Sequence, residues 1–167
     1  MWKTGDHVVH RRDGVCRIAA IEDLTLTDDG PKTYYILTPV YENSSRLYVP
    51  FDRADQILRD VLTKEEIEAM ILGLKESGPD HWISDEKTRQ RTLSETVKSC
   101  SEESLLKMVS TLFVKKMEQT EQGRKFHAAD EHLLNEGEKM INREFAFVLG
   151  IEPDDVPDYV GKQMEET

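Results

Sequence analysis

The stretch GDHVVHRRDGVCRIAAIE, residues 5–22, has the pattern of two short strands joined by a tight turn. Val8 belongs to a β-rich run, and Val15 lies in a second run in which apolar side chains recur. Between the two runs, Asp13 and Gly14 supply the left-handed backbone position that a tight hairpin requires. The stretch therefore predicts a β-hairpin near the start of the chain.

Further strands follow at short spacing. The run TYYILTPV, residues 33–40, is dense in aromatic and β-branched side chains and follows a Gly-Pro turn. RLYVPF, residues 46–51, is expected as a fourth short strand that ends at Pro50, and a fifth strand is expected near residues 56–59. Short strands at this spacing predict a small closed or half-open barrel.

From Thr63 onward the apolar residues recur every three or four positions, which is the period of helices with one buried face. Thr63 with Glu66 three residues later has the pattern of a capping box, and a Gly-Pro break then ends this helix. Later helices are expected to start near Ser84, at Ser101 and at about Ala128, the last ending at Leu149. The positions expected on the apolar stripes of the last two helices are Leu105, Met108, Val109, Leu112, Phe113, Leu133, Leu134, Met140, Ile141, Phe145 and Val148.

The two periodicities predict an α+β protein, with an N-terminal SH3/Tudor-like β-barrel followed by a C-terminal all-helical bundle. The predicted domains are residues 1–60 for the barrel and 61–150 for the bundle. Residues 151–167 are acidic, contain two prolines and are expected to form a tail with at most a short helical turn.

The composition, 38% hydrophobic and 33% charged residues, is typical of a folded, soluble protein. The chain has no apolar run long enough to span a membrane, and its first residues lack the apolar core that is expected of a signal peptide. Its two widely separated cysteines are typical of a reducing cytoplasm. The net charge of −11 divides into −2 for residues 1–62 and −9 for the remainder. Because phosphate binding needs clustered cations, tight binding of free DNA by charge alone is excluded.

The hairpin histidines do not form a predicted metal or catalytic site. His7 and His10 are three apart, which places them on opposite faces of a strand, and no cysteine or acid accompanies them at ligand spacing. A nucleophilic pair of Cys16 with His10 lacks a visible orienting group. We therefore expect surface histidines, no bound metal or cofactor, and no enzymatic activity.

Trp82 lies just after a Gly-Pro break and just before a predicted helix that carries Lys87, Arg89 and Arg91. Lys87 and Arg91 are four residues apart and therefore neighbours on one helix face. Two interpretations of Trp82 are open. It packs as a satellite core residue against the first helix, or it forms, with these cations, an aromatic wedge that contacts DNA.

The N-terminal pattern resembles that of the CarD/CdnL family of bacterial transcription regulators, whose first domain is shared with the transcription-repair coupling factor. The family pattern runs Gly-Asp-x-Val-Val-His, a short turn, Gly-Val-Gly-x-Ile, Ile-Glu, Tyr-Tyr-x-Leu and Leu-x-Val-Pro. The matching positions are Gly5, Asp6, Val8, Val9, His10, Gly14, Val15, Ile18, Ile21, Glu22, Tyr34, Tyr35, Leu37, Leu47, Val49 and Pro50. Cys16 stands where the family pattern has its second glycine.

This resemblance implies that residues 1–60 bind the β subunit of RNA polymerase by pairing an exposed strand edge with the partner's sheet. The polymerase-binding positions that it implies are Leu24, Leu26, Arg46 and Tyr48.

The resemblance extends more loosely to the helical part, where family members carry a tryptophan that wedges into promoter DNA at the upstream edge of the transcription bubble. Trp82 falls where that tryptophan is expected, and Lys87 falls at a basic position of the family. The DNA-binding positions expected here are Trp82, Lys87, Arg89 and Arg91. Many members have arginines directly after the tryptophan, whereas this chain has Ser84, Asp85 and Glu86.

We therefore expect a cytoplasmic, monomeric regulator that docks on RNA polymerase and stabilises the open promoter complex. Tethering to polymerase raises the local concentration of DNA, so that a modest intrinsic affinity suffices. One alternative is an acidic adaptor that binds polymerase and recruits a protein partner without touching DNA. Asp85, Glu86 and the charge of −5 in residues 151–167 favour it. A second alternative is a free-standing relative of the repair-factor domain.

Overall fold

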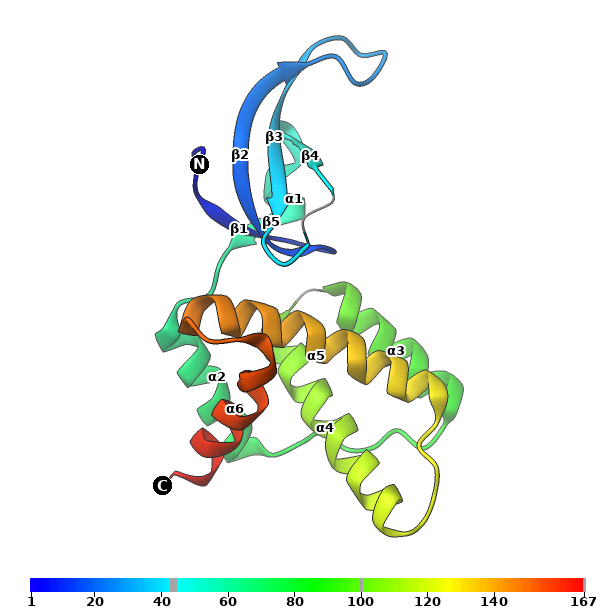
Figure 1. Cartoon of the computed structure of the whole chain (residues 1–167). Coiled ribbons are helices and arrows are strands. Elements are labelled where there is room, and N and C mark those ends of the chain that lie inside the picture. The colour runs from blue at the N-terminus through cyan, green and yellow to red at the C-terminus, as the bar shows by residue number, and fades with distance from the viewer. Residues whose placement is uncertain (43–44, 100, 167) are drawn as a thin grey trace. The chain divides into compact units, whose positions relative to one another are not determined.

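The predicted hairpin is present as strands β1 (His7–His10) and β2 (Gly14–Leu24). They belong to a computed structural model that describes residues 1–42, 45–99 and 101–166 (Figure 1). Gly14 has a φ of +76°, a left-handed conformation that a residue with a side chain rarely adopts, so the Asp-Gly turn is confirmed. The pairing of Val8 with Cys16 and of Val9 with Val15 fixes the register of the hairpin.

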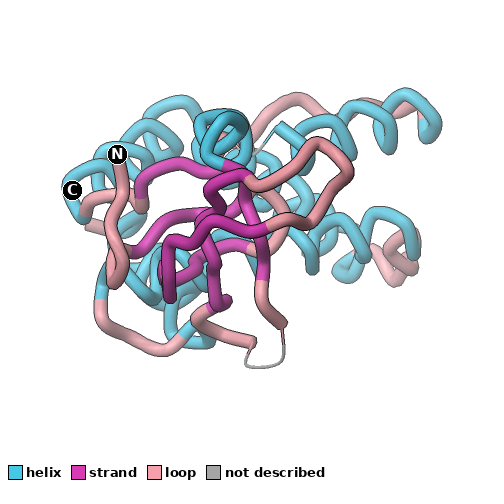
Figure 2. Tube along the Cα trace, turned by 90° about the horizontal axis from the view of Figure 1, so that it is seen from above, coloured by secondary structure: helices cyan, strands magenta, loops and turns pink. Residues whose placement is uncertain are grey.

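Three more strands extend the hairpin into an antiparallel sheet: β3 (Lys32–Pro39), β4 (Leu47–Pro50) and β5 (Leu58–Asp60). The strand order is β4-β3-β2-β1-β5, and a register shift between Ile18 and Ala20 interrupts the pairing of β2 with β3. Such irregularities bend a strand and increase its twist, and the sheet is strongly bent and twisted (Figure 2). The α+β class is confirmed by this sheet and the helices that follow it.

The predicted SH3/Tudor-like barrel is not confirmed. Among the described residues, β4 and β5 are the two ends of the strand order, and no pairing between them closes the sheet. The fifth strand expected near residues 56–59 is present as β5, and it is preceded by a 3₁₀ turn, η1 (Phe51–Arg53), and a four-residue helix, α1 (Ala54–Ile57). This segment covers one face of the sheet, where Ala54 packs with Val8, Ile18 and Leu37 in a buried apolar cluster.

The helical part contains α2 (Lys64–Ser77), α3 (Glu86–Ser99), α4 (Glu102–Glu121) and α5 (Ala128–Leu149). The capping box is confirmed, because Thr63 Oγ1 accepts from the Glu66 backbone N–H while Glu66 Oε2 accepts from the Thr63 N–H. The helix predicted to start near Ser84 begins at Glu86, and the carboxylate of Asp85 accepts from the Thr88 N–H and so caps α3.

The segment predicted as a tail is folded. It contains a 3₁₀ turn, η2 (Pro153–Asp155), and a ten-residue helix, α6 (Val156–Glu165), whose Val156 is 1% exposed in the helical core. Two prolines did not prevent the helix, because Pro157 lies in its first turn, where the missing N–H has no partner to lose. The expectation of at most one helical turn is therefore wrong.

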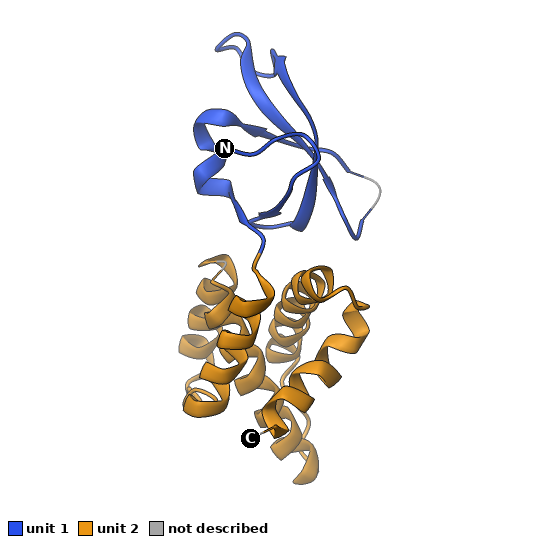
Figure 3. Ribbon diagram, turned by 90° about the vertical axis from the view of Figure 1, so that its left-hand side faces the viewer, with its two compact units in different colours: residues 1–61 blue, residues 62–167 orange. Residues whose placement is uncertain are grey.

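The chain divides into two units with separate cores, Met1–Val61 and Leu62–Thr167 (Figure 3). Most predicted stripe residues of α4 and α5 are buried, including Leu112 and Phe145 at 0% exposure. Among these stripe residues, Phe113 is the exposed one, at 50%, because its side chain projects about 100° around α4 from that of Leu112 and lies outside the face that packs on the core. No helix of the described residues is both long and apolar enough to cross a lipid bilayer.

Candidate functional site

The first candidate surface lies on strand β4, at one end of the sheet order. Tyr48 is 45% exposed, and Arg46, directly before the strand, is also exposed. One backbone edge of β4 pairs with β3, and the described residues provide no strand partner for the other edge. An unpaired strand edge offers N–H and C=O groups that can extend into a partner's sheet.

The other two residues predicted for this surface lie at the far end of β2. Tyr48 pairs with Ile36, which in turn pairs with Ala20, so the three share the sheet face opposite the apolar cluster. Leu24 follows in the same alternation and is half-buried, whereas Leu26 lies in the loop beyond the strand and is 52% exposed. The prediction that Leu24 and Leu26 lie on an outer strand is therefore wrong, although Leu24 shares a sheet face with Tyr48.

The hairpin histidines differ in environment. His7 is exposed, but the His10 side chain is only 13% exposed, so the prediction of a surface residue is wrong for His10. Its Nδ1 accepts hydrogen bonds from the backbone N–H groups of Arg12 and Asp13, which ties it to the hairpin turn. Burial lowers the pKa of His10 and raises the pKa of the Cys16 thiol to about 12, so Cys16 stays a neutral thiol. Within the described residues, no three His, Cys, Asp or Glu side chains gather as a metal site.

The second candidate surface is the segment from Gly78 to Asp85, which we call the Trp82 loop. Trp82 is half-buried and packs against the helical core, as the packing interpretation expected. Two cations lie over its ring, the Arg89 guanidinium at 4.5 Å and the Lys115 ammonium at 5.4 Å from the ring centroid. These distances lie within the range of cation–π attraction.

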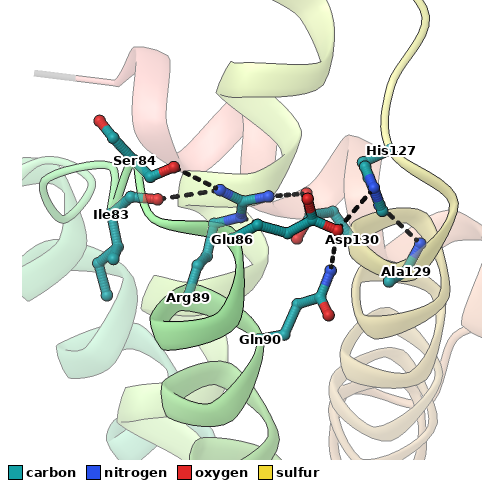
Figure 4. A network of polar contacts seen from close by, with 8 residues as sticks. All are labelled: Ile83, Ser84, Glu86, Arg89, Gln90, His127, Ala129 and Asp130. Atoms are coloured by element: carbon teal, nitrogen blue, oxygen red, sulfur yellow. Dashed lines mark hydrogen bonds and ion pairs between the residues drawn. The ribbon is translucent and has the colours of Figure 1, made fainter.

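Arg89 does not belong to an exposed basic cluster. It is 7% exposed, and its guanidinium forms an ion pair of 2.8 Å with Asp130, which is 1% exposed (Figure 4). The charge is therefore neutralised inside the protein and withdrawn from the surface. The expectation that Arg89 lies among exposed cations is therefore wrong. Arg89 is buried because it lies on the side of α3 that faces α5. Lys87 and Arg91 are exposed.

The two acids that replace family arginines have internal partners. Asp85 accepts from the backbone N–H and the hydroxyl of Thr88, and these bonds lower its pKa. Glu86 Oε1 lies 2.8 Å from His127 Nε2 at the start of α5. Both carboxylates are exposed at the surface, but each also stabilises the beginning of α3.

Sequence reasoning missed Asp130, Lys115 and Thr111, which hold the Trp82 loop from other helices. Asp130 and Arg89 are 41 residues apart, so no spacing rule connects them. Thr111 Oγ1 accepts from the Asp80 backbone N–H at 2.9 Å, across 31 residues. The only local signal was Asp130 itself, an acid in the first turn of a helix, which is common on surfaces as well.

A family model described as the CarD-like/TRCF RID domain matches residues 2–62, which is nearly the whole first unit. No curated protein matches the chain.

Proposed function

Because residues 2–62 form a CarD-like/TRCF RID domain, this chain is an RNA polymerase-interacting, transcription-related protein, and we propose that it stabilises the open promoter complex. The regulator is non-enzymatic, monomeric and cytoplasmic, and it uses no cofactor. Its first unit docks on the polymerase β subunit, and its helical unit contacts promoter DNA at the upstream edge of the bubble. The family match over the first unit is the observation that carries the proposal.

The open edge of β4 supports docking by strand addition. Backbone N–H and C=O groups of β4 pair with a strand of the β subunit and provide most of the affinity. Tyr48 and Arg46 flank that edge and are exposed, and both residue types contribute strongly to protein interfaces. Leu26 adds an exposed apolar contact at the far end of β2.

The DNA contact consists of the exposed part of Trp82 together with Lys87 and Arg91, the exposed cations of α3. A net charge of −9 in residues 62–167 makes independent DNA binding weak. Docking of the first unit compensates, because it confines the helical unit near the promoter and so raises the effective concentration of DNA.

The docking test is co-purification of RNA polymerase with the double variant Arg46→Glu, Tyr48→Ala. We expect a clear loss of bound polymerase with the thermal unfolding of the first unit unchanged. Arg12→Glu is the matched control, since Arg12 is also exposed but lies in the hairpin turn between β1 and β2, and this variant should bind polymerase normally. Wild-type yield with the folded double variant would refute this surface.

The DNA test is the decay rate of open complexes with Trp82→Ala. We expect intact polymerase binding and a shorter open-complex lifetime, since stacking of an aromatic side chain on a base contributes roughly 1–3 kcal/mol. Lys87→Ala should act in the same direction with a smaller effect that fades at high salt. An unchanged decay rate in a folded Trp82→Ala variant would end the DNA proposal.

The alternative function is that of an acidic adaptor that recruits a protein partner and leaves DNA untouched. The surface of the helical unit favours it, with a charge of −9 and with Phe113 and Met117 about half exposed on α4. The adaptor predicts unchanged open-complex decay in Trp82→Ala. It also predicts that Asp85→Lys with Glu86→Lys abolishes recruitment of the partner.

A further inference from the structure

Arg89 on α3 and Asp130 on α5 form a forked ion pair inside the helical unit. Arg89 Nε donates to Asp130 Oδ1 at 3.0 Å, and Nη2 donates to Oδ2 at 2.8 Å (Figure 4). The two side chains are 8% and 1% exposed. Two parallel bonds between planar groups fix the orientation of the guanidinium as well as its position.

The remaining terminal nitrogen of Arg89 holds the backbone of the Trp82 loop. Nη1 donates to the carbonyl oxygen of Ile83 at 3.0 Å and to that of Ser84 at 3.4 Å. These two carbonyls belong to the residues that directly follow Trp82. One side chain therefore connects helix α5 to the backbone from which the tryptophan projects.

The same guanidinium also touches the tryptophan ring, with Cζ 4.5 Å from the ring centroid. Arg89 thus contacts both the ring and the backbone beside it. Because Asp130 fixes the plane of the guanidinium, it also fixes the surface on which the ring of Trp82 rests.

Other contacts secure the loop, whereas Arg89 and Lys115 are the cations that lie over the ring of Trp82, which also packs against the helical core. Asp80 is bound on α4, where its N–H donates to Thr111 and its carboxylate lies 3.5 Å from Lys107 Nζ. At the other end, Asp85 caps α3. Lys115 lies farther from the ring, at 5.4 Å, and its side chain is 31% exposed, so it holds the ring less firmly than Arg89.

We propose that Arg89, oriented by Asp130, is a positioning residue that fixes the Trp82 ring and its loop for contact with promoter DNA. The purpose of the contact rests on the proposed function, whereas the positioning of the ring can be measured without DNA. Arg89 itself does not bind phosphate, because Asp130 neutralises it. Its replacement therefore acts through Trp82 and lacks the salt dependence expected for Lys87.

The first experiment measures acrylamide quenching of Trp82 fluorescence in the full chain with Trp2→Phe, since the sequence contains only these two tryptophans. Asp130→Asn removes the charge that orients Arg89, and Arg89→Lys keeps the charge but loses the fork. Both should shift the quenching constant of Trp82 from its folded value toward that of the urea-unfolded chain. The measurement is made below the unfolding transition, as verified by circular dichroism.

Asp158→Asn is the matched control, because Asp158 also lies in the first turn of a helix but is exposed. It should leave the quenching constant unchanged. If a single replacement fails to fold, the paired variant Arg89→Met, Asp130→Leu leaves no buried charge unpaired and should still release the ring. Parental quenching in the folded variants would overturn the proposal.

The second experiment combines Asp130→Asn with Trp82→Ala in open-complex decay. If the ion pair acts through the tryptophan, Asp130→Asn shortens the lifetime on its own but adds no further loss in the Trp82→Ala background. An equal further loss in that background would overturn the proposal. If Trp82→Ala alone leaves the lifetime unchanged, the proposed function fails, and the quenching result still decides whether Arg89 positions the ring.

Discussion

Each unit places an aromatic residue beside an arginine, but the two pairs are used in different ways. On β4, Arg46 and Tyr48 are both exposed at an open strand edge. Beside the Trp82 loop, Arg89 is 7% exposed, and its guanidinium lies against the ring of Trp82. The first pair, Arg46 and Tyr48, is exposed on the surface. In the second pair, Arg89 is part of the buried structure that supports Trp82.

The difference follows from the kind of element that carries each pair. Side chains alternate across a strand, so the exposure of Tyr48 follows once Val49 is placed in the core. A helical side chain is exposed or buried according to which neighbouring helices cover its face. For Arg89, the covering helix is α5, which lies far along the chain.

The largest contrast should come from removing each arginine. Arg89→Ala leaves Asp130 buried without its counter-ion, and breaking a buried pair in this way costs roughly 3–5 kcal/mol of unfolding free energy. Arg46→Ala should change stability by less than about 0.5 kcal/mol, as is usual for an exposed side chain. Urea denaturation of both variants measures the two values. Similar losses of unfolding free energy in the two variants would contradict the distinction between a structural Arg89 and an exposed Arg46.

Two neighbouring apolar residues extend the contrast within α4. Leu112 is 0% exposed and Phe113 is 50% exposed. Leu112→Ala should cost roughly 2–5 kcal/mol through the cavity that it leaves. Phe113→Ala should cost less than about 0.5 kcal/mol despite the larger side chain, because its ring is mostly outside the core. Chemical denaturation followed by Trp82 fluorescence measures the unfolding free energy of each variant. A larger loss of stability for Phe113→Ala than for Leu112→Ala would refute the assigned helix face.

Replacement of two helical glycines by alanine should change stability by an intermediate amount. A Cβ on Gly137 of α5 would lie 2.8 Å from Val109 Cγ2 and from Met108 Cε, which shows how closely α4 and α5 approach. Gly137→Ala should therefore destabilise by roughly 1–3 kcal/mol through overpacking. Gly161 of α6 has open space, and Gly161→Ala should stabilise by up to about 1 kcal/mol. Thermal melts of both variants measure the shifts, and a stabilised Gly137→Ala would contradict the close approach.

The smallest expected effect lies in the first unit and depends on pH. Burial lowers the pKa of His10 below its ordinary value of 6.5, with Arg12 adding to the shift and Asp13 opposing it. Below pH 6.5 the unfolded chain binds a proton that the folded chain resists, so stability is fully present above this pH and falls as the pH drops.

His10→Gln should reduce this dependence. The measurement compares the urea midpoints of wild type and variant at about pH 8 and about pH 5.5, on either side of the ordinary histidine pKa. Trp82→Phe leaves Trp2 as the reporter of the first unit. Identical midpoint shifts in both proteins would show that His10 does not contribute.

The sequence by itself determined the elements whose signals are local. Gly14 marked the hairpin, Pro50 marked the end of a strand, and Thr63 with Glu66 marked the start of α2. Each of these signals acts within about four residues, through a backbone dihedral angle, a missing N–H or a side-chain cap. The ordered family pattern in residues 5–50 likewise identified the first unit as the CarD-like/TRCF RID domain.

Only the tertiary structure decided which side chains remained at the surface. It paired Arg89 with Asp130 across 41 residues, turned Phe113 outward beside Leu112, and packed Val156 of the supposed tail into the helical core. Helical periodicity predicts an apolar face but not the width of the region that neighbouring helices cover. A cation at the border of that face is buried only where the fold brings an acid to meet it, as α5 brings Asp130 to Arg89.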